Sequence, residues 1–192
     1  MMDESAIPLK RMVDANLALL VQADLSADER EYRRGWPETV RPLEAYCHRL
    51  PNVVLVDKTF PIPAVAERAH VALGADPASF EDFSDAVEMK RYVIYVHDGF
   101  GRFSRKPLEA VEALPADELP LTLTEGIFLL LHHPERRLIR HGIICAGSCD
   151  ERGRYPVISA VSRGYLLSAL EPTARLYRDT VASRGLIIPS SM

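Results

Sequence analysis

The stretch Leu121–Leu138, LTLTEGIFLLLHHPERRL, most constrains the fold, because it predicts a buried helix whose two ends are both marked. Thr122 and Glu125 have the spacing of a capping box, in which each side chain accepts a hydrogen bond from a backbone N–H at the helix start. The apolar residues that follow cover more than one helix face, and a proline after the two histidines ends the helix. We therefore predict a largely buried helix over residues 122–133. Gly126 inside it indicates close packing against a neighbouring backbone.

Short β-branched or alternating runs between turn-forming residues predict strands elsewhere in the chain. The predicted strands cover residues 52–57, 91–98, 142–147, 156–161 and 165–170. Helical spacing of apolar residues predicts further helices. They cover residues 7–21, a segment from Pro37 to Pro51, and residues 64–73, 106–114 and 173–184. The charged residues 25–34 predict a solvated helix or loop, and residues 75–85 predict a loop.

These elements predict an α+β fold in a single domain over residues 1–192. Residues 1–50 form its helical N-terminal part, and residues 51–192 form its α+β core. In that core a mixed or antiparallel sheet packs against the buried helix at 122–133.

Composition excludes several classes of protein. Hydrophobic residues make up 47% and charged residues 26%, which is ordinary for a soluble globular chain. A net charge of −4 argues against nucleic-acid binding, which usually needs a strongly basic face. No apolar run is long enough to span a membrane. The acidic start predicts no signal peptide, and three cysteines fit a reducing compartment, so we expect a cytoplasmic protein.

Histidines and cysteines allow two interpretations each. His141, Cys145 and Cys149, joined by His132 or His133, could supply four zinc ligands, although the spacing matches no finger or knuckle. The alternative is that the cysteines are buried and structural, and on that basis we predict no metal and no cofactor. The two adjacent histidines are either a protonated cap at a helix C-terminus or a catalytic acid and base.

No stretch of the sequence contains a known catalytic motif. Cys149 with Asp150, or Ser148 with His141, can be drawn as a dyad, but neither pair has a nucleophile elbow around it. A phosphate loop and a dinucleotide fingerprint are both missing. We predict no catalytic residue, and the question of an enzymatic function stays open.

A basic segment stands out from the acidic remainder. Residues 136–163 hold six arginines and two acidic residues, so the net charge of this segment is +4. Since the net charge of the whole chain is −4, the remaining residues carry a net charge of −8. Arginine suits bidentate capture of carboxylates. The predicted peptide-binding residues are Arg136, Arg137, Arg140, His141, Arg152, Arg154, Arg163 and Tyr165. The alternative is that these charges are scattered over a solvated surface without a common target.

The segment from Val93 to Leu138 resembles an uncharacterised bacterial family, a domain of unknown function. The resemblance is carried by a strand ending in Asp98-Gly99, by Pro107-Leu108-Glu109-Ala110, and by Leu121-Thr122-Leu123-Thr124-Glu125-Gly126-Ile127. In size and layout the chain is also similar to the peptide-binding accessory proteins of crocagin-type ribosomal-peptide natural-product pathways. That resemblance implies binding of a precursor peptide rather than autonomous catalysis.

The leading functional hypothesis is therefore a peptide-binding accessory protein, which holds a precursor peptide for tailoring enzymes of such a pathway. Its partner would be a peptide or protein that presents an acidic segment or a carboxylate terminus, added to an exposed strand edge. One rival is a small enzyme of the same kind of pathway, for cyclisation or hydrolysis, using His132, His133, His141 or Cys149. Another is a purely structural homodimer.

Overall fold

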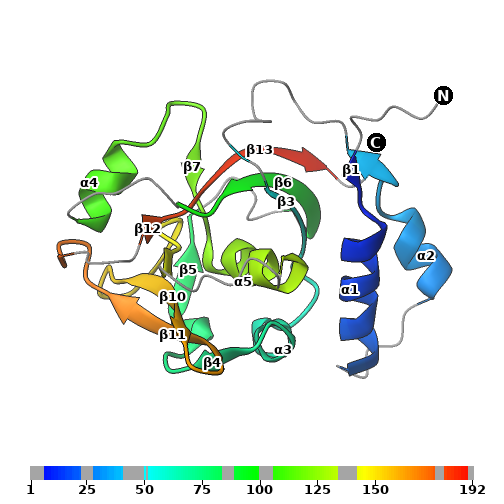
Figure 1. The fold of residues 1–192 in the computed structure, drawn as a ribbon, viewed down its shortest axis with the longest axis horizontal. Helices are drawn as coiled ribbons and strands as arrows, with labels where there is room; N and C mark the ends of the chain where they lie inside the picture. The colour runs from blue at the N-terminus through cyan, green and yellow to red at the C-terminus, as the bar shows by residue number, and fades with distance from the viewer. Residues whose placement is uncertain are drawn as a thin grey trace.

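The fold is α+β, as the sequence predicts. The computed structural model describes residues 7–22, 28–40, 50, 52–83, 89–99, 106–133, 142–175 and 180–189. Figure 1 shows its arrangement, with α5 (Leu123–His132) near the centre of the molecule. That helix begins with the predicted capping box, and all ten of its residues are buried. Within the described residues, no helix has the length and apolar character needed to cross a membrane.

A four-stranded antiparallel sheet packs on α5. Its strands are β3 (Asn52–Asp57), β6 (Arg91–His97), β13 (Ser183–Pro189) and β7 (Leu119–Pro120), in the order β3-β6-β13-β7. All six residues of β3 are buried, as expected of its continuous apolar run. Figure 1 shows α5 between this sheet and α3 (Ile62–Arg68).

A second sheet is mixed. Its strands are β12 (Thr180–Val181), β8 (Ile143–Ile144), β10 (Tyr155–Val161), β11 (Gly164–Leu170) and β4 (Val71–Leu73), in the order β12-β8-β10-β11-β4. β10 and β11 form an antiparallel hairpin, whereas β4 and β12 join the sheet in parallel. A separate pair joins β5 (Phe80–Asp82) to β9 (Ser148–Asp150).

The described residues of the N-terminal part form the helices α1 (Lys10–Gln22) and α2 (Glu29–Arg34) and a short strand pair, β1 (Ile7–Pro8) with β2 (Thr39–Val40). The helix predicted over 7–21 therefore starts three residues late, because Ile7 and Pro8 pair with β2 instead. The helix predicted from Pro37 is wrong at Thr39 and Val40, and its residues 41–49 lie outside the described residues.

Two further helix predictions are wrong in part. The helix predicted over 64–73 ends at Arg68, His70 takes a left-handed conformation at φ 57°, and Val71–Leu73 pair with β11. The helix predicted over 173–184 is wrong wherever its residues are described: residues 173–175 are not helical, and residues 180–181 and 183–184 lie in β12 and β13. In both places, hydrogen bonds to distant strands outweigh a weak local helical preference. The loop predicted over 75–85 also holds a 3₁₀ turn, Pro77–Ser79, and β5.

The remaining elements agree more closely with the sequence. The helix predicted over 106–114 is α4 (Pro107–Glu112), and the strands predicted at 156–161 and 165–170 are β10 and β11. One continuous apolar cluster contains side chains from α1 and α2 together with β3, β6 and α5. Gly126 is closely packed as predicted, but its neighbour is a side chain rather than a backbone. A Cβ on Gly126 would lie 2.5 Å from the Cys145 Sγ.

Candidate functional site

The two adjacent histidines satisfy the outer edge of β3. The Leu55 N–H donates to His132 Nδ1 at 3.3 Å, and His132 Nε2 lies 2.9 Å from Asn16 Oδ1 on α1. His133 Nε2 lies 2.8 Å from the carbonyl oxygen of Val53. Since β3 pairs only with β6 in its sheet, these backbone groups face away from the ladder and need other partners. The histidine pair supplies them.

These contacts settle the state of His132. Its Nδ1 accepts from Leu55, so its proton lies on Nε2 and is donated to Asn16. Burial lowers the pKa of His132 to about 3, with a further contribution from neighbouring His133. The interpretation of His132 as a protonated helix cap is therefore wrong. A catalytic role is also disfavoured, because both ring nitrogens are engaged in structural hydrogen bonds.

Of the three cysteines, Cys47 lies outside the described residues, and Cys145 and Cys149 are poor nucleophiles and poor metal ligands. Cys145 is fully buried, and burial raises the pKa of its thiol. Partial burial, together with the carboxylates of Asp150 and Glu81, raises the pKa of Cys149. A raised pKa keeps both groups in the unreactive thiol form. His141 lies outside the described residues, and within them no group of three His, Cys, Asp or Glu side chains could hold a metal ion.

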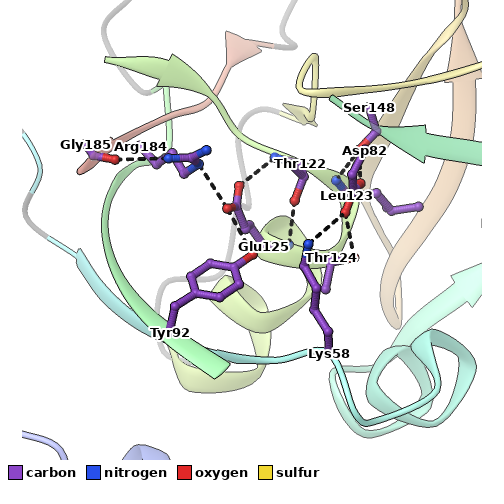
Figure 2. Close-up of polar contacts among 10 residues, drawn as sticks. All are labelled: Lys58, Asp82, Tyr92, Thr122, Leu123, Thr124, Glu125, Ser148, Arg184 and Gly185. Carbon is purple, nitrogen blue, oxygen red and sulfur yellow. Dashed lines mark hydrogen bonds and ion pairs between the residues drawn. The ribbon is translucent and has the colours of Figure 1, made fainter. Parts of the chain in front are cut away.

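A buried polar cluster surrounds the start of α5 (Figure 2). The Glu125 carboxylate accepts from the Thr122 N–H at 2.8 Å and from the Tyr92 hydroxyl at 3.2 Å. Arg184 Nε lies 3.0 Å from Glu125 Oε1, and both side chains are almost completely buried. Burial raises the pKa of Glu125, and the Arg184 guanidinium opposes that rise. The cluster joins β6, β13 and α5 in the interior.

The second half of this cluster involves Ser148. Its hydroxyl accepts from the Leu123 N–H at 2.8 Å and donates to Asp82 Oδ1 at 2.5 Å. Asp82 also accepts from Thr124, and Lys58 Nζ lies 3.9 Å away (Figure 2). Ser148 is fully buried, so a substrate has no access to its hydroxyl. The arrangement holds β5 and β9 against α5 and is structural.

The best candidate site is a cavity of about 1100 Å³ between α1, α3, the end of α5 and the β10–β11 turn. We call it the arginine cavity, because each of three separate elements contributes one arginine. Its described lining residues are Arg11, Ala15, Arg68, Ala69, His70, Leu130, Leu131, His132, Ala160, Val161, Ser162, Arg163, Gly164 and Tyr165. None of these lining residues is acidic.

The charges around the cavity favour an anion. Arg11, Arg68 and Arg163 contribute three positive charges at its lining, and all three side chains are exposed. The C-terminal turns of α3 and α5 also face it, and a helix C-terminus carries a partial charge of about −0.5. Two such ends offset only about one of the three positive charges. The cavity therefore has a net positive lining in a protein whose total charge is −4.

The approach of the β10–β11 turn to α3 depends on two unusual backbone positions. His70 has φ 57°, and its carbonyl oxygen accepts from the Tyr165 N–H at 2.9 Å. Gly164 has φ 130°, and a Cβ there would lie 2.5 Å from the His70 carbonyl oxygen. Glycine at position 164 is thus what allows the hairpin turn to approach His70, and it places Arg163 in the lining of the same cavity as Arg68.

The structure divides the predicted peptide-binding residues. Arg163 and Tyr165 line the arginine cavity. Arg152 and Arg154 precede β10, at the far end of the hairpin, so the strand separates them from Arg163 by about 20 Å. Arg154 pairs there with Asp150 at 2.7 Å. The others, Arg136, Arg137, Arg140 and His141, lie outside the described residues. A peptide-binding role for these four residues stays a prediction.

Sequence reasoning missed Arg11, Arg68 and His70. Arg11 lies in an amphipathic helix and Arg68 ends a short one, and charges in such places usually mark a solvated face. No local pattern distinguishes them, because their meeting with Arg163 depends on how α1, α3 and the hairpin pack. The only local signal is the Ser162-Arg163-Gly164 turn, which places an arginine at the tip of a hairpin.

Comparisons with models of protein families, with curated proteins and with solved structures found no match for this chain. The resemblance carried by Val93–Leu138 therefore stays a prediction.

Proposed function

We propose that this protein is an accessory protein that binds a peptide through an acidic segment or a carboxylate terminus held in the arginine cavity. One observation carries the proposal. Arg11, Arg68 and Arg163 come from distant parts of an acidic chain, yet they line one cavity without an acid among its described lining residues. The planar guanidinium group of arginine binds a carboxylate with two parallel hydrogen bonds. Arginine therefore suits this ligand better than lysine, whose ammonium group acts as a point charge.

The neighbouring strand offers a way to bind the rest of the peptide. β4 is an edge strand of the mixed sheet and begins directly after His70 at the cavity. Ala72 and Leu73 on this strand are exposed. A peptide whose acidic group binds in the cavity could extend along β4 and add main-chain hydrogen bonds, as in strand addition.

The resemblance to accessory proteins of ribosomal-peptide pathways supports a narrower form of the proposal. In that form the protein works in the cytoplasm and holds a precursor peptide for tailoring enzymes. The rival enzymatic role loses support, because His132 is engaged at both nitrogens and the pKa of Cys149 is raised.

The test is a binding titration with two fluorescent decapeptides. One is rich in glutamate and ends in leucine with a free carboxylate, and the other is rich in lysine and ends in a carboxamide. We expect the glutamate peptide alone to bind, with an affinity that falls as salt rises. Arg163→Gln and Arg68→Gln should each weaken it by about tenfold. Arg152→Gln is the matched control, because it removes an exposed arginine at the far end of the same hairpin.

Two results would overturn the proposal. One is a glutamate peptide that does not bind at low salt. The other is an equal loss of affinity in Arg152→Gln and Arg163→Gln, which would show that the general charge of the surface matters and the cavity does not.

A further inference from the structure

We infer that the arginine cavity takes the free C-terminal carboxylate of a peptide whose last side chain is apolar. The inference rests on the proposed function and narrows its ligand from acidic peptides in general to one kind of chain end. It is motivated by the arrangement of charged and apolar groups in the cavity.

The floor of the cavity is apolar and its rim is cationic. Leu130, Leu131, Ala69 and Tyr165 are lining residues that are at least nine-tenths buried. The three lining arginines are exposed. Each of the two cations on the α3 and hairpin side stands beside a buried apolar residue in the chain: Arg68 precedes Ala69, and Arg163 lies two residues before Tyr165. A ligand that uses both kinds of lining residue would present an anion and an apolar group close together.

The last residue of a peptide has this combination. Its carboxylate and its side chain leave the same carbon atom, so the carboxylate can bind at the rim while the side chain packs on the floor. An internal glutamate or aspartate carries its charge at the end of its own side chain and brings no adjacent apolar group. An acidic internal segment would leave the half-exposed Val161 of the cavity lining facing water or charge, without the gain from apolar burial.

The donors at the rim also match a carboxylate. An ionised carboxylate has about four lone-pair sites and no proton to donate. Two guanidinium forks can fill all four of these sites, and the hydroxyl of Ser162 is a further lining donor. A C-terminal carboxamide replaces one acceptor oxygen with an NH₂ group, which would face guanidinium donors without an acceptor to bind. The volume of about 1100 Å³ lies just above the usual range for small-ligand pockets, so it suits a few terminal residues of a peptide.

The experiment uses the full chain and four fluorescent hexapeptides built on glycine and serine. The first ends in leucine with a free carboxylate, and the second has the same sequence with a C-terminal carboxamide. The third ends in serine with a free carboxylate. The fourth carries two internal glutamates and a carboxamide end. Fluorescence anisotropy is measured at low salt for the unmodified protein and for Arg163→Gln, Arg68→Gln and the control Arg152→Gln.

We expect the leucine acid to bind at least about tenfold more tightly than its carboxamide and than the serine acid. That preference should shrink in Arg163→Gln and Arg68→Gln and persist in Arg152→Gln. Equal binding of the acid and the carboxamide would overturn the inference, as would equal binding of leucine and serine ends. If the fourth peptide binds best, through the same arginines, the inference fails and the proposed function stands. If none of the four binds, both fail.

Discussion

Arg184 and Arg163 carry the same guanidinium group in opposite surroundings. Arg184 is fully buried and lies 3.0 Å from the carboxylate of Glu125, next to Tyr92 and the start of α5. Arg163 is exposed at the tip of a hairpin, where the described lining of its cavity contains two further arginines and no acid. Burial with a partner inside the chain marks the first region as structural. Convergence of like charges at an open cavity marks the second as a place for a partner from outside.

The largest effect is expected in the buried region. Glu125→Ala leaves the Arg184 guanidinium buried without its counter-charge and also removes half of the capping box. We expect a loss of about 3–5 kcal/mol in the free energy of unfolding, measured by urea denaturation. The control is Arg163→Ala, which should change stability by less than about 0.5 kcal/mol, because it removes an exposed side chain.

If Glu125→Ala lowers the free energy of unfolding by less than about 1 kcal/mol, the contrast between the buried Arg184 and the exposed Arg163 is not supported. It would mean that the interior accommodates Arg184 without its partner. Where Glu125→Ala does not fold, Glu125→Gln gives the same comparison in a milder form. Glutamine keeps an oxygen for the Thr122 N–H, but it removes the charge and turns an NH₂ group toward Arg184 in place of the second oxygen.

A pH dependence is expected from His132, which lines the arginine cavity at the end of α5. Its pKa is lowered to about 3 in the folded protein, against about 6.5 in an unfolded chain. Above pH 6.5 the ring is neutral in both states, and its favourable contribution is fully present. As the pH falls from 6.5 toward 3, the unfolded chain takes up a proton and the folded protein does not, so stability decreases. Between pH 7 and pH 4 this loss amounts to about 3 kcal/mol.

Urea denaturation at both pH values measures the effect. Other groups also titrate in this range, so the comparison is made with His132→Gln. The variant should be less stable at pH 7, and its stability should fall by about 3 kcal/mol less on acidification. The same pH dependence in both proteins would show that another group is responsible.

The smallest effect is expected at Gly126. A Cβ added there would lie 2.5 Å from the Cys145 Sγ and 3.4 Å from Ile158 Cδ1. Overpacking of this kind costs about 1–3 kcal/mol, and the better helix propensity of alanine offsets up to about 1 kcal/mol. Gly126→Ala should therefore lower the free energy of unfolding by about 1–2 kcal/mol.

The double variant Gly126→Ala/Cys145→Ala tests the cause of that loss. Removing the sulfur makes room for the new methyl group, so alanine at position 126 should be neutral or stabilising in the Cys145→Ala background. A double-mutant cycle measures the coupling. Additive losses would show that the strain lies elsewhere in the helix.

The parts of this fold that the sequence determined are those with strong local signals. The capping box of Thr122 and Glu125 predicts the start of α5 where the structure has it. The apolar run of β3 and the alternating side chains of β6 likewise predict those strands close to their observed bounds. These signals are local, because a helix cap and a strand pattern depend on residues a few positions apart. The Ser162-Arg163-Gly164 turn between two strands belongs to the same group.

Tertiary structure decided the rest, through groups that are far apart in the sequence. Val71–Leu73 and Thr180–Val181 are strands because distant strands offer them hydrogen bonds, against a local preference for helix. His132 is neutral because packing buries it, and its hydrogen-bond partners Asn16 and Leu55 lie 116 and 77 residues away in the chain. Arg11 and Arg68 belong to the candidate site only because α1 and α3 pack beside the hairpin that carries Arg163. A side chain's partner, charge state and access to a ligand depend on packing, and no local pattern records them.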